Sequence, residues 1–122
     1  MDTVSIRIPA LPAYIQVVRL VAAGLASRLK FTLDEIEDLK IAVDELASYV
    51  IGSQGRDGTL EIRFSILEDA LEIHGEGHLS GHPKVRTELT QFSRVILDSV
   101  ADSASLQQLD GVPTFELLKK RN

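Results

Sequence analysis

The sequence contains no cysteine, so the chain can form no disulfide bond and offers no thiolate for catalysis or metal binding. It also has no long apolar run. Residues 20–26 form one of the longest, Gly24 interrupts it, and about 20 residues are needed to cross a bilayer. The first three residues lack the basic-then-apolar order that opens a signal peptide. We therefore expect a cytoplasmic protein that makes no membrane contact.

The chain has fewer basic than acidic residues: it contains 13 Lys and Arg and 18 Asp and Glu, which gives a net charge of −5. Non-specific nucleic-acid binding depends on a basic face, so we expect no nucleic-acid partner. A length of 122 residues is enough for one hydrophobic core and too short for two. The sequence therefore predicts a single domain over residues 1–122.

The first half of the chain shows three clear periodic segments. Apolar and polar residues alternate over residues 3–8, which predicts a strand. Apolar residues then recur at three- and four-residue steps from Ile15 to Leu29, and again from Ile36 to Val50, which predicts two helices. Thr32 and Glu35 form a capping-box pattern at the start of the second helix.

The second half predicts two hairpins with a helix between them. Residues 60–66 and 71–74 form the first hairpin, and residues 75–83, rich in glycine and histidine, are expected to be a loop. A helix is expected over residues 84–102, and Asp110-Gly111 predicts the second hairpin. The apolar residues expected on the inner face of that helix are Val85, Leu89, Phe92, Ile96 and Val100.

This order of elements, β-α-α-β-β-α-β-β, predicts an α+β fold. We expect a two-layer α/β sandwich in which three helices cover one face of a mostly antiparallel sheet. Fold alone gives no function, so the function must be sought in particular residues.

One stretch of the sequence carries a specific resemblance. The run Glu35-Ile36-Glu37-Asp38-Leu39-Lys40-Ile41-Ala42-Val43, with Glu45 two residues later, closely resembles the anti-sigma-factor serine kinases of the RsbW-like type. These kinases belong to the GHKL (HATPase_c) ATPase superfamily, and their fold agrees with the order of elements derived above. The resemblance implies binding to a sigma factor, to a STAS-domain antagonist or to both, and it implies a homodimer.

The catalytic helix of that family carries an E-x-x-x-N motif. The resemblance implies that its Glu is a general base and its Asn a Mg²⁺ ligand; residues four apart lie on the same helix face. Here Glu45 is present, but Tyr49 stands in the place of the Asn. A phenol is a poor ligand for Mg²⁺. Glu45 is therefore either a vestigial base or an ordinary solvated residue, and Tyr49 either plugs the former pocket, contacts a partner or is purely structural.

The other two nucleotide motifs also depart from the family pattern. The family has a D-x-G-x-G motif at the end of a strand, and the resemblance implies that its Asp accepts a hydrogen bond from the adenine amino group. Glycines are present in this region, at Gly75 and Gly77, but Gly75 stands at the place of the Asp. The family's glycine-rich lid has no counterpart, because residues 84–100 contain no glycine. We therefore identify the chain as a degenerate member that needs no cofactor, with ATP and Mg²⁺ used only if it is an active kinase.

Arg19 and the histidines complete the candidate sites. The resemblance implies that Arg19 contacts the sigma factor and the antagonist. An ordinary arginine on the helix surface is an equally good interpretation. His74, His78 and His82 could bind zinc only if they converged, and the expected loop gives them no common face, so we expect no metal site. Three functions follow: an anti-sigma binding factor, an active serine kinase that phosphorylates a STAS protein, or a partner that titrates a true kinase.

Overall fold

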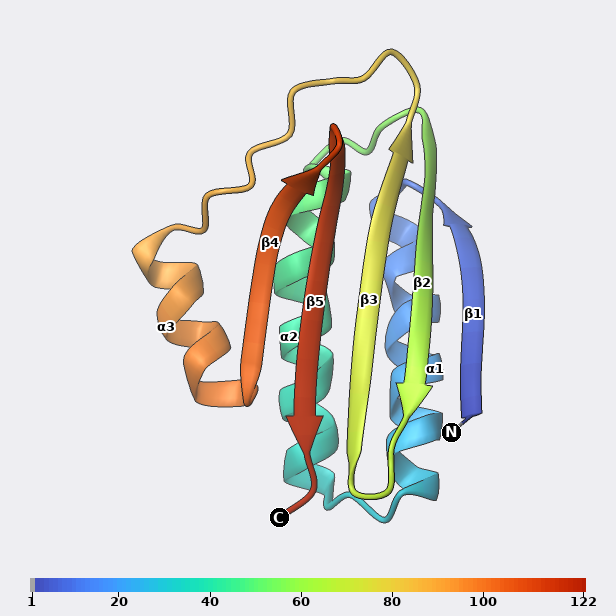
Figure 1. Ribbon diagram of the computed structural model, residues 1–122, viewed down its shortest axis with the longest axis vertical. Helices are drawn as coiled ribbons and strands as arrows, with labels where there is room; N and C mark the ends of the chain where they lie inside the picture. The colour runs from blue at the N-terminus through green and yellow to red at the C-terminus, as the bar shows by residue number, and fades with distance from the viewer. Residues whose placement is uncertain (1) are drawn as a thin grey trace.

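The computed structural model describes residues 2–122 and contains one five-stranded sheet. All four strand pairings are antiparallel, and the strand order is β1-β2-β3-β5-β4 (Figure 1). In chain order the elements are β1 (Asp2–Pro9), the 3-10 turn η1 (Pro12–Tyr14), α1 (Ile15–Arg28), α2 (Leu33–Ile51), β2 (Gly58–Ile66), β3 (Ala70–Leu79), α3 (Gln91–Val100), β4 (Ser103–Leu109) and β5 (Val112–Lys120).

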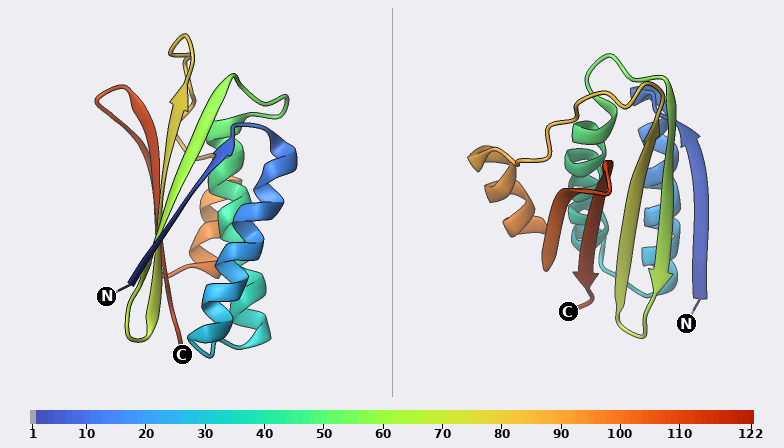
Figure 2. Two further views of the ribbon diagram at one scale, coloured as in Figure 1. Left: turned by 90° about the vertical axis from the view of Figure 1, so that its right-hand side faces the viewer. Right: turned by 45° about the horizontal axis from the view of Figure 1, so that its top comes forward.

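The three helices lie on one side of the sheet, and the other side is open to solvent (Figure 2). Helices α1 and α2 pack along the sheet, whereas α3 lies at its edge against α2 and β4. The predicted two-layer α+β sandwich is therefore confirmed, in the predicted order of elements. Within residues 2–122, no helix is both long enough and apolar enough to span a membrane.

Helix α2 forms where the sequence predicts it, because its ends carry strong local signals. The backbone N–H of Glu35 donates to Thr32 Oγ1 at 3.1 Å, and the backbone N–H of Thr32 donates to Glu35 Oε1 at 2.7 Å. This capping box satisfies two backbone donors that a helix start otherwise leaves unpaired. Gly52 ends the helix with a positive φ of 79°. The buried stripe includes Leu39, Val43, Leu46 and Val50.

The loop expected over residues 75–83 starts only at residue 80, because β3 continues to Leu79; the expectation is wrong for residues 75–79. Gly75 and Gly77 face the core, where larger side chains from other elements occupy the space above them. A Cβ on Gly75 would overlap the ring of Phe115, and a Cβ on Gly77 would lie 2.6 Å from Cγ1 of Val50. Glycine at these places therefore reflects close packing within a strand, and not a turn.

The start expected for the third helix is also wrong. Helix α3 begins at Gln91, seven residues later than expected, because Thr90 caps it: Thr90 Oγ1 accepts from the backbone N–H of Ser93 at 3.0 Å. The inner face differs as well. Phe92 is 75% exposed, and the buried residues are Ser93, Leu97 and Val100. The apolar spacing before Thr90 imitates a helical stripe, but those residues have no helical backbone.

Candidate functional site

Glu45 and Tyr49 lie one turn apart on α2 and both contact the N-terminal end of α3. Tyr49 donates its hydroxyl to Ser93 Oγ at 2.8 Å and accepts from the backbone N–H of Thr90 at 3.0 Å. Ser93 in turn donates to the carboxylate of Glu45. We call these four residues, Glu45, Tyr49, Thr90 and Ser93, the Tyr49–Ser93 cluster. The cluster joins α2 to α3 where the family resemblance expects a base, a metal ligand and a phosphate-binding loop.

The electrostatics of Tyr49 reflect this bonding. Burial acts to raise the pKa of the Tyr49 hydroxyl, but hydrogen bonds to Ser93 and Thr90 and the positive charge of Arg86 outweigh it. The net result is a pKa below the usual value for tyrosine. Ser93 is only 4% exposed, so its hydroxyl is committed to partners inside the protein. A metal ion or a phosphate group that approached this face would have to displace the hydrogen bonds among Tyr49, Thr90 and Ser93.

Gly75 and Gly77 both lie beneath side chains of other elements, and Gly77 also lines a cavity of about 190 Å³ with Leu79. Gly75 pairs with Phe115 across β3 and β5, and the fully buried Phe115 ring covers it. Gly77 lies beneath Val50, the residue that follows Tyr49 on α2. Gly75, the position that the resemblance assigns to the adenine acceptor, is therefore covered by the protein's own core.

Arg19 lies apart from the cluster, on the outer surface of α1. Its Nη1 is 2.9 Å from Oδ2 of Asp44 on α2, and both side chains are partly exposed. The contact with Asp44 was not predicted, because the two residues are 25 positions apart in the sequence. Burial raises the pKa of Asp44; the charge of Arg19 opposes this increase, and the charge of Glu45 adds to it.

A cavity of about 260 Å³ lies between α1 and α2 beside this ion pair. We call it the α1–α2 groove. Its rim carries exposed apolar side chains, with Leu20 60% exposed and Ile41 45% exposed. Neither residue was predicted as part of a site, although both lie off the buried stripes of their helices, which was a usable signal. The lining residues are Gln16, Arg19, Leu20, Glu37, Lys40, Ile41 and Asp44.

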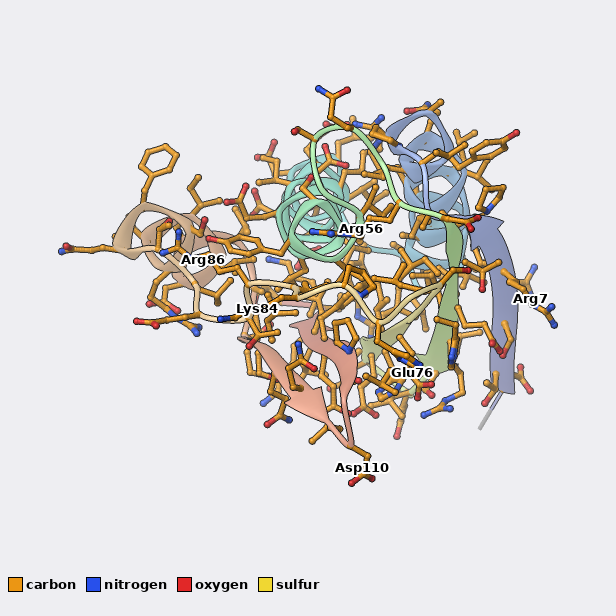
Figure 3. The ribbon with its side chains drawn as sticks, turned by 90° about the horizontal axis from the view of Figure 1, so that it is seen from above. Arg7, Arg56, Glu76, Lys84, Arg86 and Asp110 are labelled. Atoms are coloured by element: carbon orange, nitrogen blue, oxygen red, sulfur yellow. The ribbon has the colours of Figure 1, made fainter. Side chains whose placement is uncertain are left out.

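His74 and His78 lie on the open face of the sheet, on the side away from the helices. Because β3 extends through this region, His74 and His78 do share a face, and the expectation that they would not is wrong. Glu76 lies between them, and Figure 3 shows it on the opposite side of the sheet from Arg56, which bonds the end of α2. His82 follows the strand, with a positive φ of 47°.

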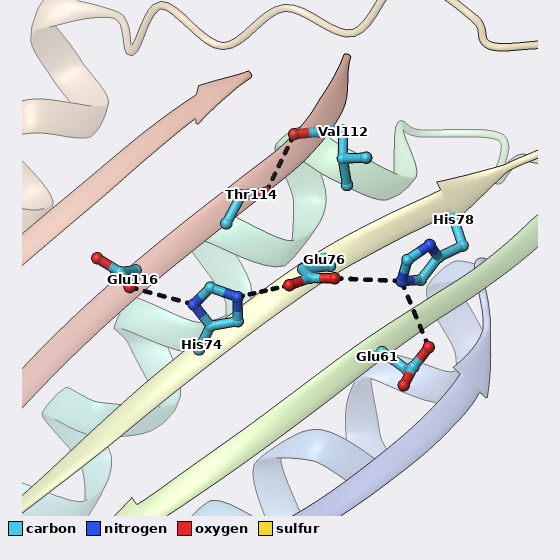
Figure 4. Close-up of polar contacts among 7 residues, drawn as sticks. All are labelled: Glu61, His74, Glu76, His78, Val112, Thr114 and Glu116. Carbon is cyan, nitrogen blue, oxygen red and sulfur yellow. Dashed lines mark hydrogen bonds and ion pairs between the residues drawn. The ribbon is translucent and has the colours of Figure 1, made fainter. Parts of the chain in front are cut away.

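These side chains form a continuous polar chain across three strands (Figure 4). His74 contacts Glu116 at 3.1 Å and Glu76 at 2.8 Å, and His78 lies 3.3 Å from both Glu76 and Glu61. The hydrogen bond from His74 lowers the pKa of Glu76, although burial opposes it. Within residues 2–122, no three His, Asp or Glu side chains are arranged to hold a metal ion.

Comparison with known proteins gives a consistent family of relatives. No protein-family model matches the chain. Serine-protein kinase RsbW of Bacillus subtilis (strain 168) is 41% identical over 75 residues, covering 59% of this chain and 47% of the relative. RsbW of Bacillus pumilus is 42% identical over 78 residues, and RsbW of Halalkalibacterium halodurans is 40% identical over 73 residues. The match to the Bacillus pumilus protein covers 60% of this chain and 48% of the relative. The match to the Halalkalibacterium halodurans protein covers 59% of this chain and 45% of the relative.

The chain thus matches about half the length of these curated relatives. Their identity of about 40% extends over some three fifths of the chain and recurs across several species. The α+β sandwich described above is the fold that the resemblance to anti-sigma-factor kinases implies. Over this stretch, the chain is similar to the serine-protein kinases RsbW.

Proposed function

We propose that this chain is an anti-sigma regulatory factor that binds a sigma factor or a STAS-type antagonist and has lost the use of ATP. The observation that carries the proposal is the Tyr49–Ser93 cluster, which occupies the place of the kinase's metal and phosphate contacts with internal hydrogen bonds. A chain that keeps the scaffold and fills the reaction centre retains a surface for binding. We further propose that it acts in the cytoplasm as a homodimer.

Three contacts argue against nucleotide use. Mg²⁺ prefers carboxylate, carbonyl or water oxygens, and Tyr49 offers a phenol that is already bonded to Ser93 and Thr90. One oxygen of the Glu45 carboxylate already accepts a hydrogen bond from Ser93, so that oxygen would have to release Ser93 before it took a proton from another hydroxyl. The place of the adenine acceptor, Gly75, lies beneath Phe115.

The α1–α2 groove supports the binding role. It combines a guanidinium, on Arg19, with exposed apolar side chains at Leu20 and Ile41. Arginine is enriched among the residues that contribute most to binding at protein interfaces, whereas exposed charges at the rim contribute little. This surface lies on a different side of α1 and α2 from their contact with the sheet, so a partner could dock without disturbing the core.

The proposal is tested by calorimetric titration of the chain with sigma factors and STAS proteins from the same genome. Arg19→Ala should weaken binding at least about tenfold, as expected when an interface arginine is truncated. Arg28→Ala is the matched control, because Arg28 is an exposed arginine of the same helix outside the groove. Binding to none of these proteins, or equal affinities for the wild type and Arg19→Ala, contradicts the proposal. Size-exclusion chromatography tests the homodimer.

An active serine kinase is the second candidate, and one contact favours it. Ser93 donates its hydroxyl to Glu45, which is the arrangement that a general base uses towards a serine substrate. Titration with Mg-ATP at millimolar concentration separates the two candidates, since a working kinase must bind nucleotide. Phosphate transfer to a STAS protein that is lost in Glu45→Gln would establish the kinase. Mixing with an authentic RsbW-type paralogue on a sizing column tests whether the chain instead titrates a true kinase.

A further inference from the structure

We propose that Asp44 is a built-in competitor for Arg19, so that a partner entering the α1–α2 groove must replace Asp44 with an acceptor of its own. The proposal rests on the binding role proposed above and adds a residue that controls its affinity. Asp44 would set a threshold that the partner has to exceed before Arg19 becomes available.

The geometry of the ion pair indicates that it is poised to open. Only one contact joins the two groups, Arg19 Nη1 to Asp44 Oδ2 at 2.9 Å, although a guanidinium and a carboxylate can form two parallel bonds. Arg19 Nε and Asp44 Oδ1 are both buried and have no hydrogen-bond partner among residues 2–122. A buried donor or acceptor without a partner is unfavourable, so the closed pair is less stable than its short contact suggests.

The surroundings of Asp44 weaken the pair further. Asp44 is next to Glu45 in the chain, and the charge of Glu45 and burial both disfavour the Asp44 carboxylate. Arg19 is a third exposed and Asp44 about two fifths exposed, so water screens their attraction. Opening the pair therefore costs little, and a partner's acceptor can take the guanidinium without disrupting the core.

The groove also indicates what kind of partner segment fits it. Its second cation, Lys40, is held by Glu37 at 3.1 Å, so both cations of the groove are paired within the chain when it is empty. Leu20 and Ile41 remain exposed on its rim. A segment that carries one large apolar side chain beside a carboxylate would cover the rim and take Arg19 from Asp44. Carboxylate is the acceptor that binds guanidinium most strongly.

The test compares the wild type with Asp44→Asn, which keeps the side-chain shape and removes the charge that holds Arg19. Calorimetric titration with the sigma factor or STAS partner should show binding about two- to fivefold tighter for Asp44→Asn, the range that part-exposed ion pairs contribute. Asp98→Asn is the matched control, because it removes a carboxylate from another arginine, Arg94, outside the groove. We expect its affinity to equal that of the wild type.

A second measurement reports on the pair without any partner. Proton exchange between water and the Nη1 protons of Arg19, the group that donates to Asp44, should become faster in Asp44→Asn than in the wild type when it is followed by NMR. Unchanged exchange, or a partner affinity equal to or weaker than that of the wild type, overturns the competition. If every variant including the wild type fails to bind, the proposed binding role itself has failed. If Arg19→Ala loses binding while Asp44→Asn leaves it unchanged, only the competition is wrong.

Discussion

Replacing Gly75 by alanine tests whether the place of the kinase's adenine acceptor is filled by the core. Gly75 lies in β3 directly opposite Phe115 of β5, and the Phe115 ring is fully buried. A Cβ at residue 75 would overlap three ring carbons of Phe115, closer than the 3.0 Å that real Cβ atoms respect. The ring cannot move aside freely, because protein cores are packed as densely as organic crystals.

The size of the effect follows from two opposing contributions. Inserting a methyl group into a well-packed core costs about 1–3 kcal/mol, and the direct overlap with an aromatic ring places Gly75→Ala at the upper end. Alanine also restricts the unfolded chain more than glycine does, and inside a strand this stabilises the folded state by about 0.5–1 kcal/mol. We therefore expect Gly75→Ala to lower the free energy of unfolding by about 2 kcal/mol.

Urea unfolding of three variants measures this value and identifies its cause. If the Phe115 ring is responsible, combining Gly75→Ala with Phe115→Leu should cost at least about 1 kcal/mol less than the sum of the single changes. Gly24→Ala is the control: Gly24 lies in α1 with no atom within 4 Å of an added Cβ, and the variant should be about 1 kcal/mol more stable. A Gly75→Ala protein as stable as the wild type, or strictly additive effects, would refute this account of the site.

Two further predictions concern the ends of the helices. Tyr49→Phe removes the hydroxyl that joins α2 to α3, so the free energy of unfolding should fall by about 1–2 kcal/mol. Amide hydrogen exchange should accelerate in α3 more than in α2. An equal acceleration in the two helices would contradict the role of the cluster. Glu35 accepts bonds from the backbone N–H groups of Thr32 and Asn122, which lower its pKa below the ordinary 4.5. Stability gained from this carboxylate is present above pH 4.5 and lost as the pH falls below it; Glu35→Gln should flatten that part of a pH series of urea unfolding curves.

Local signals in the sequence were sufficient for much of the fold. The capping box of Thr32 and Glu35 sets the start of α2 without help from distant residues. The turn at Asp110-Gly111 takes positive φ at both positions, 52° and 79°, as its sequence predicts. The alternation in the N-terminal strand and in β2 matches the buried face of the sheet. Each of these features depends on residues within a few positions of one another.

The features that sequence missed depend on contacts between distant residues. Gly75 and Gly77 read as a loop because glycine is common in turns, whereas Phe115 and Val50 determine that they lie in a strand. The pairing of Arg19 with Asp44 joins two helices whose relative rotation no local pattern reveals. For the candidate site, the sequence named Glu45 and Tyr49 but could not identify Ser93, 44 residues beyond Tyr49, as the residue that joins them.

Two of the departures from the kinase motifs, Tyr49 and the missing glycine lid, depend on one another in this fold. The Tyr49 hydroxyl finds its partners because Thr90 begins a rigid capped helix in the region where the family resemblance expects a glycine lid. An asparagine at position 49 is shorter, so Thr90 and Ser93 would lose bonds that the phenol now makes. A carboxylate at position 75 would meet the Phe115 ring. We therefore expect that no single reversion rebuilds a nucleotide site, which agrees with the proposal that the chain acts through the α1–α2 groove.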